Sequence, residues 1–108
     1  MPFIKFHFVD RQKLASVSKT LTDGIQEVVK CPRENIVLEV IHSDYINNGS
    51  VDQGWPFVEV TWFQRPPEVQ DEVAQIIYDC LENAGYESAD VHFGYLVPEN
   101  YYENGKKI

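Results

Sequence analysis

Two halves of the sequence repeat one another, and this repetition limits the folds that the chain can adopt. Residues 2–4 (Pro-Phe-Ile) recur as residues 56–58 (Pro-Phe-Val), and Arg11 recurs as Arg65 at the same offset. Chance recurrence of a common dipeptide is the alternative explanation. Internal repetition in a chain indicates one supersecondary unit used twice.

The C-terminal ends of the two halves also match. Residues 45–49 (Tyr-Ile-Asn-Asn-Gly) correspond to residues 101–105 (Tyr-Tyr-Glu-Asn-Gly). Matches at both ends of the same intervening pattern favour duplication over chance. We therefore expect one domain over residues 1–108, made of pseudo-repeats 1–54 and 55–108.

The first half is predicted to form a strand, a helix and a second strand. Residues 2–9 alternate between apolar and polar positions, which is typical of a strand, and Asp10 suits the N-cap of a helix. A single apolar stripe follows at helical spacing: Leu14, Val17, Leu21, Ile25 and Val28. Pro32 ends the helical region. Residues 36–41 are almost continuously apolar, which predicts a strand buried on both faces.

Period-two alternation also predicts which strand residues share a face. In residues 2–9 we expect Ile4, Phe6 and Phe8 on one side of the sheet, opposite Lys5 and His7.

The second half repeats this pattern. Residues 56–63 predict a third strand, the prolines at 66–67 open a second helix, and Gly85 suits the position after its end. Residues 90–97 predict the last strand. Between the halves, residues 43–55 predict a loop or short ribbon, and the tail at 98–108 is polar.

Two right-handed β-α-β units side by side predict an α/β fold in two layers. The expected arrangement is a four-stranded sheet with both helices on one face. The other face carries a mixture of charged and aromatic side chains. An open face that is partly apolar favours association, so we expect an oligomer.

Composition excludes several classes of function. The chain has 108 residues, enough for one core, and a formal net charge of −8 without a basic cluster, which argues against nucleic-acid binding. It contains no apolar run long enough to cross a membrane and no export signal. Cys31 and Cys80 are then expected to be reduced thiols, and the expected compartment is the cytoplasm.

Several short motifs resemble the tautomerase superfamily, which includes 4-oxalocrotonate tautomerase (4-OT) and macrophage migration inhibitory factor. They are Pro2 directly after Met1, Arg11 just after the first strand, residues 31–35 (Cys-Pro-Arg-Glu-Asn), the loop at 48–49 (Asn-Gly) and the closing residues 98–105. The likeness spans nearly the whole chain and is strongest to an uncharacterised bacterial branch of the superfamily.

This resemblance implies a keto–enol tautomerase that acts on a small 2-oxo or 2-hydroxy-enoic acid without a cofactor. Pro2 would be the catalytic base once Met1 is removed, and Arg11 or Arg33 would bind the substrate carboxylate. Lys30 and His92 lie near other pocket positions of the family. The resemblance also implies a homotrimer. Arginine suits a carboxylate because its planar fork donates two parallel hydrogen bonds.

Each of these residues also has a structural interpretation. Pro2 can simply start a strand, as Pro56 does, and Arg65 is interpreted as a surface residue before Pro66. The three histidines lack the spacing of a metal site. The alternative function is a non-catalytic oligomeric protein that keeps the fold for ligand or partner binding.

Overall fold

A computed structural model describes all residues of the chain, 1–108. The first half contains a strand, a long helix, a second strand and a two-stranded ribbon: β1 (Phe3–His7), α1 (Arg11–Val29), the 3-10 turn η1 (Arg33–Asn35), β2 (Val37–Ile41), β3 (Tyr45–Asn47) and β4 (Ser50–Asp52). The second half repeats this order: β5 (Phe57–Trp62), α2 (Pro67–Asn83), β6 (Asp90–Tyr95), η2 (Pro98–Asn100), β7 (Tyr102–Glu103) and β8 (Lys106–Lys107).

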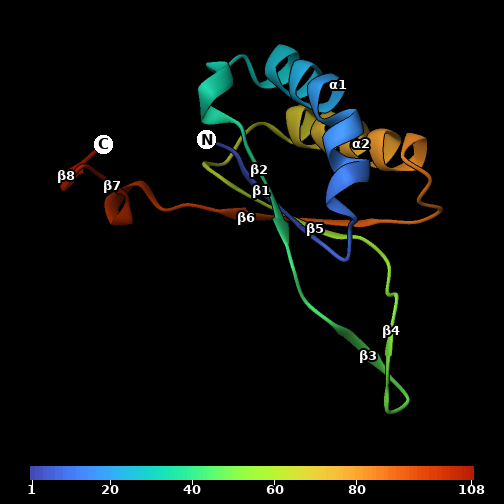
Figure 1. The fold of residues 1–108 in the computed structure, drawn as a ribbon. Coiled ribbons are helices and arrows are strands. Elements are labelled where there is room, and N and C mark those ends of the chain that lie inside the picture. Colours follow the sequence, from blue (N-terminus) through green and yellow to red (C-terminus); the bar gives the residue numbers. More distant parts are fainter.

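One four-stranded sheet joins the two halves. Its strand order is β2-β1-β5-β6, with β1 parallel to β2, β5 parallel to β6, and β1 antiparallel to β5. Both helices lie on the same face of this sheet (Figure 1). The predicted two-layer architecture from tandem β-α-β units is therefore confirmed.

The core lies between the helices and the covered face of the sheet. The central strands contribute alternate residues that are fully buried, and the helices contribute one stripe each. The members of this core include Ile4, Phe6, Val58, Val60, Trp62, Leu21, Ile25, Val73, Ile77 and Leu81. Gly24 allows α1 to approach α2 closely, because a Cβ at this position would lie 3.2 Å from Cγ2 of Ile76.

Corresponding contacts recur in the two halves. The carbonyl of Pro2 accepts a hydrogen bond from the amide of Val37, and the carbonyl of Pro56 accepts one from the amide of Asp90, both at 3.0 Å. The ring of Phe8 lies edge-on to Tyr45 at 5.6 Å between centroids. At the other end of the sheet, a second Phe–Tyr pair has the same geometry at 5.4 Å (Phe63 and Tyr101).

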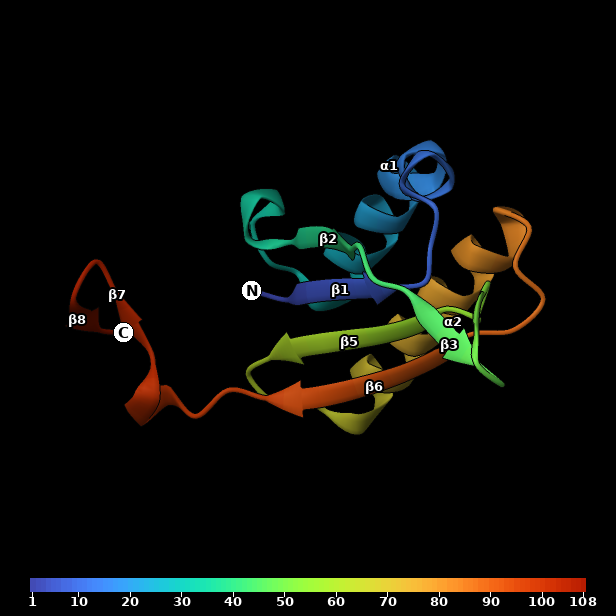
Figure 2. The same ribbon diagram turned by 60° about the horizontal axis from the view of Figure 1, so that its bottom comes forward.

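Both ribbons turn on an Asn-Gly pair. Asn48 and Gly49 have φ of 50° and 80°, and Asn104 and Gly105 have φ of 54° and 80°. Two consecutive residues in the left-handed region match the type I′ turn that the right-handed twist of a tight hairpin requires. The ribbons extend from opposite ends of the sheet (Figure 2), and the molecule measures 45 Å along its longest axis. The ribbon at 43–55 was predicted, whereas the tail ribbon was not.

The predicted helix boundaries follow from the caps. Asp10 lies just before α1, and its carboxylate accepts the Lys13 amide at 3.0 Å, which confirms the predicted N-cap. Gly85, with φ of 105°, follows the C-cap of α2 as expected.

The prediction for Phe8 was wrong. β1 ends at His7, and Phe8 has φ of 61°, so the strand alternation does not reach it. The reversal turns Phe8 away from the core and places Val9, which is 7% exposed, into it. Strand periodicity fails here because it assumes extended backbone at every position.

The prediction that residues 36–41 are buried on both faces was also wrong. β2 is the edge strand of the sheet, and Val37 on its open face is 38% exposed. Leu38 and Val40 pack against the core from the other face. The sequence is apolar on both faces, but the single chain covers only one of them.

The buried stripe of α1 yields a stability prediction. Ile25 is fully buried between α1 and the sheet, so Ile25→Ala should lower the free energy of unfolding by about 2–5 kcal/mol, and Ile25→Val by about 0.5–1.5 kcal/mol. Urea denaturation at one fixed protein concentration measures both values. Equal losses for the two variants would contradict this packing.

Candidate active site

The antiparallel pairing of β1 with β5 determines what lies near Pro2. Phe3 pairs with Thr61, so the start of β1 lies beside the end of β5. Arg65 follows β5 and therefore reaches the N-terminus of the chain. Arg11 follows the other end of β1, beside the start of β5, and lies far from Pro2 of the same chain.

Arg65 is held by contacts from several directions. Its Nη2 donates to the carbonyl oxygen of Met1 at 3.3 Å, and its Nη1 donates to the carbonyl of Phe63. The guanidinium carbon lies 5.3 Å from the centre of the Trp62 ring, a cation–π distance. These contacts fix a half-buried guanidinium whose charge faces the peptide that precedes Pro2.

The surroundings of Pro2 disfavour positive charge. The Pro2 ring is fully buried at the start of β1. Burial is the largest cause that lowers the pKa of the neighbouring Met1 amine, and the Arg65 charge lowers it further, whereas Cys31 opposes the shift. An amine in these surroundings loses its proton at a lower pH than one in water.

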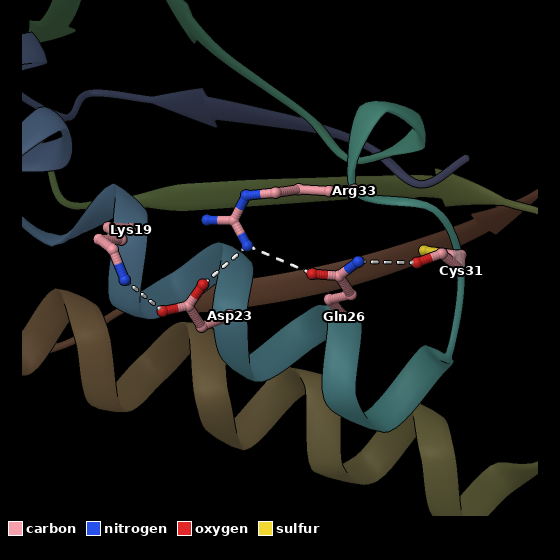
Figure 3. Close-up of polar contacts among 5 residues, drawn as sticks. All are labelled: Lys19, Asp23, Gln26, Cys31 and Arg33. Carbon is pink, nitrogen blue, oxygen red and sulfur yellow. Dashed lines mark hydrogen bonds and ion pairs between the residues drawn. The ribbon is translucent and has the colours of Figure 1, made fainter.

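Arg33 is engaged with helix α1. Its Nη1 donates to Oδ1 of Asp23 at 2.7 Å and to Oε1 of Gln26 at 3.3 Å, as Figure 3 shows. Hydrogen bonds from Lys19 and then Arg33 lower the pKa of the Asp23 carboxyl. Gln26 also donates to the carbonyl of Cys31, so these contacts tie the loop before β2 to α1.

The other predicted pocket residues are dispersed within the single chain. Lys30 is an exposed C-cap of α1 with φ of 60°. His92 is exposed on the open face of the sheet, opposite Glu59 in the register of β5 and β6. Arg11 is exposed at the first turn of α1. No hydrogen bond or ion pair joins any of them to the N-terminal segment.

The interpretation of Arg65 as a surface residue was wrong. Arg65 is half-buried and is the arginine that contacts the N-terminal segment. The signal that could have found it was present, because Arg65 repeats Arg11. What the repeat did not show was that β5 runs antiparallel to β1, which moves the second arginine to the first proline.

The open face of the sheet carries a row of polar side chains, three of them carboxylates or an ammonium. Glu39, Lys5, Glu59 and His92 lie side by side across the four strands. Nε2 of His7 lies 2.6 Å from Oε2 of Glu59. Lys5 lies directly across from Glu39 and Glu59, and opposite charges in such cross-strand pairs favour this order of strands.

No group of three or more His, Cys, Asp or Glu side chains is arranged to hold a metal ion. Cys31 and Cys80 are both free thiols, as predicted. None of the helices has the length and apolarity needed to cross a membrane.

The duplicated β-α-β sheet with both helices on one face is the fold that this chain shares with solved members of the tautomerase superfamily. A macrophage migration inhibitory factor-like protein from Entamoeba histolytica shares it with a TM-score of 0.71 at 12% identity, over 99% of this chain and 98% of that chain. The R7 fused 4-OT asymmetric trimer gives 0.80 at 11% identity, over 97% and 94%.

The chain itself belongs to the family described as Domain of unknown function (DUF1904), whose model matches residues 1–107. The structure of a DUF1904 domain from Sebaldella termitidis is similar with a TM-score of 0.92 at 25% identity, and each chain is covered fully. No curated protein matches the sequence. The resemblance to the tautomerase superfamily and to an uncharacterised bacterial branch of it is confirmed.

Proposed function

We propose that this protein is a keto–enol tautomerase that uses the Pro2 nitrogen as its base and acts on a small 2-oxo or 2-hydroxy-enoic acid. The observation that carries the proposal is the hydrogen bond from Arg65 to the Met1 carbonyl, at 3.3 Å. That oxygen is separated from the Pro2 nitrogen by one carbon. Arg65 therefore lies within about 6 Å of the nitrogen.

The proposed base needs a free amine. With Met1 in place, the Pro2 nitrogen is a tertiary amide without basicity, and removal of Met1 makes it a secondary amine. Burial and the nearby guanidinium both disfavour its protonated form, which moves its pKa toward neutral pH, where a base is most useful. The ring also fixes the direction of the lone pair.

The reaction needs no cofactor. The Pro2 amine takes the proton from the enol hydroxyl, and the ammonium so formed delivers a proton to the substrate carbon as the carbonyl forms. Arg65 takes a substrate oxygen in the position that the Met1 carbonyl oxygen occupies here. A guanidinium at this place stabilises the negative charge that grows on that oxygen.

Further cations come from neighbouring subunits in this proposal. The protein carries a net charge of −8, so its overall field repels an anionic substrate and local cations must bind it. Arg11 lies at the wrong end of β1 for Pro2 of its own chain, and we assign it to Pro2 of an adjoining subunit in a homotrimer. Arg33, Lys30 and His92 remain proposed pocket residues on the same basis.

The free thiols support a reducing compartment, the cytoplasm.

Kinetics of phenylenolpyruvate ketonisation test the two principal roles. Pro2→Ala should lower kcat/KM by about 10²-fold or more, because a positioned base contributes this much. Arg65→Gln should lower kcat/KM by about 10²-fold through the lost oxyanion contact, and Arg65→Lys should recover part of it. Lys19→Gln removes an exposed cation on α1 and serves as the control, with an unchanged rate.

The starting material for this experiment is untagged protein whose intact mass shows that Met1 is absent. A mass that includes Met1 would leave no basic ring nitrogen and would favour the non-catalytic alternative. Equal rates for wild type and Pro2→Ala would remove Pro2 from the mechanism, whatever the mass.

The pH profile separates electrostatic from purely binding roles of Arg65. Only the unprotonated amine is a base, so kcat/KM should rise as pH rises through the pKa of Pro2. Arg65→Gln removes a nearby cation that disfavours the ammonium, so the pKa should rise and the limb should move to higher pH. Titration of the Pro2 nitrogen by NMR gives the same shift without turnover. A limb that stays in place would restrict Arg65 to substrate binding.

The homotrimer is tested by mass in solution. Sedimentation velocity should give three times the 12.5 kDa chain mass. Val37→Lys places a charge on the exposed edge strand and should dissociate the trimer without unfolding the chain, whereas Gln75→Lys on the exposed side of α2 should leave it intact. A wild-type monomer at high protein concentration would contradict the assembly.

A further inference from the structure

Aromatic side chains form a pocket at the end of the sheet opposite Pro2. A cavity of about 170 Å³ is lined by Phe8, Tyr45, Trp55, Phe57 and Asp90. Four of these five residues are aromatic, and the fifth supplies a carboxylate. Phe57 begins β5, Tyr45 begins β3 and Asp90 begins β6, whereas Phe8 directly follows β1 and Trp55 lies just before β5.

The planes of the neighbouring aromatic rings are steeply inclined to one another, so the rings do not form a flat patch. Phe8 and Tyr45 meet at 79°, and Tyr45 and Trp55 meet at 61° with 6.0 Å between their centroids. Steeply inclined rings enclose a concave space, whereas a subunit contact on a sheet face needs a broad apolar surface. A concave space of this size can hold a small chemical group of a ligand.

The carboxylate is held at the edge of this space. Nε1 of Trp55 donates to Oδ2 of Asp90 at 3.0 Å, which fixes both side chains. None of the basic side chains lines this cavity or pairs with Asp90. The negative charge of Asp90 is therefore available to a ligand.

The cleft beside this cavity is also lined by aromatic and acidic side chains. It has a volume of about 600 Å³, shares Phe8 and Trp55 with the cavity, and adds the carboxylates of Asp10 and Glu87. Its single basic residue, Lys13, already places its ammonium 5.0 Å over the Tyr86 ring.

The repeated half of the molecule provides an internal comparison. The Phe63–Tyr101 pair reproduces the Phe8–Tyr45 pair at the Pro2 end. There Val37 pairs with Phe3 in the position where Asp90 pairs with Phe57. The carboxylate therefore belongs to only one of the two ends.

We propose that Phe8, Tyr45, Trp55, Phe57 and Asp90 form an aromatic cage that binds an organic ammonium ion, with the rest of the ligand in the adjoining cleft. Ring faces attract a cation through their quadrupole, and a quaternary ammonium suits such a cage because its charge is spread over methyl groups. The net charge of −8 attracts the same ligand over longer range. The cage lies at the other end of the sheet from Pro2 of the same chain, and choline binding to it does not require the proposed tautomerase activity.

Choline chloride is the probe, titrated by calorimetry at constant ionic strength. Saturable binding to wild type is expected, with at least tenfold weaker binding of the neutral alcohol in which carbon replaces the quaternary nitrogen. Asp90→Asn and Trp55→Leu should each weaken choline binding by about tenfold, which corresponds to about 1.4 kcal/mol. Tyr102→Leu, at an aromatic residue that is 58% exposed on the other ribbon, is the matched control and should bind like wild type.

Three results would overturn the proposal. They are equal affinity for choline and its neutral analogue, no saturable binding of choline, and the same loss in Tyr102→Leu as in Trp55→Leu. Asp90→Asn keeps the size of the side chain, so it tests the charge even if Trp55→Leu disturbs the fold. A Trp55 indole N–H resonance that moves as far on choline addition to Asp90→Asn as on the same addition to wild type would also contradict the cage.

Discussion

The antiparallel pairing of β1 with β5 is the interaction on which the rest of the structure depends. It joins two β-α-β units that each have parallel strands, and it closes one sheet under both helices. A parallel union would have put equivalent ends of the halves together. The antiparallel union instead brings Arg65 to Pro2 and leaves Arg11 at the far end, so the position of every candidate residue follows from this one ladder.

Much of the fold could be predicted from the sequence because local rules decide it. Helical spacing gave the buried stripe of α1, and the carboxylate of Asp10 gave its start. The side of the sheet on which Phe8 lies was predicted wrongly. Phe8 itself has a positive φ that ends the strand, and the alternation of apolar and polar residues does not show where a strand ends. The burial of β2 was predicted wrongly for a different reason. Its residues are apolar on both faces, but β2 lies at the edge of the sheet and a single chain covers only one of these faces.

The candidate site was harder to predict because it is made by pairing between distant segments. Pro2 was recognisable from its place in the sequence, but Arg65 reaches it only through the register of β1 and β5. Arg33 looked equally suitable, yet its charge is engaged by Asp23. Residue type and spacing identify which arginines could bind a carboxylate. The hydrogen-bond partners of each arginine in the folded chain determine which of them faces the candidate site.

Pro56 begins β5 as Pro2 begins β1, and both rings are fully buried. Linking two such units in one polypeptide turns the second ring nitrogen into a permanent peptide linkage that no processing enzyme can release. A chain with this internal repeat therefore has one N-terminus for two equivalent proline positions. The nitrogen of Pro56 therefore cannot act as a base, and the surroundings of Pro56 can diverge from those of Pro2.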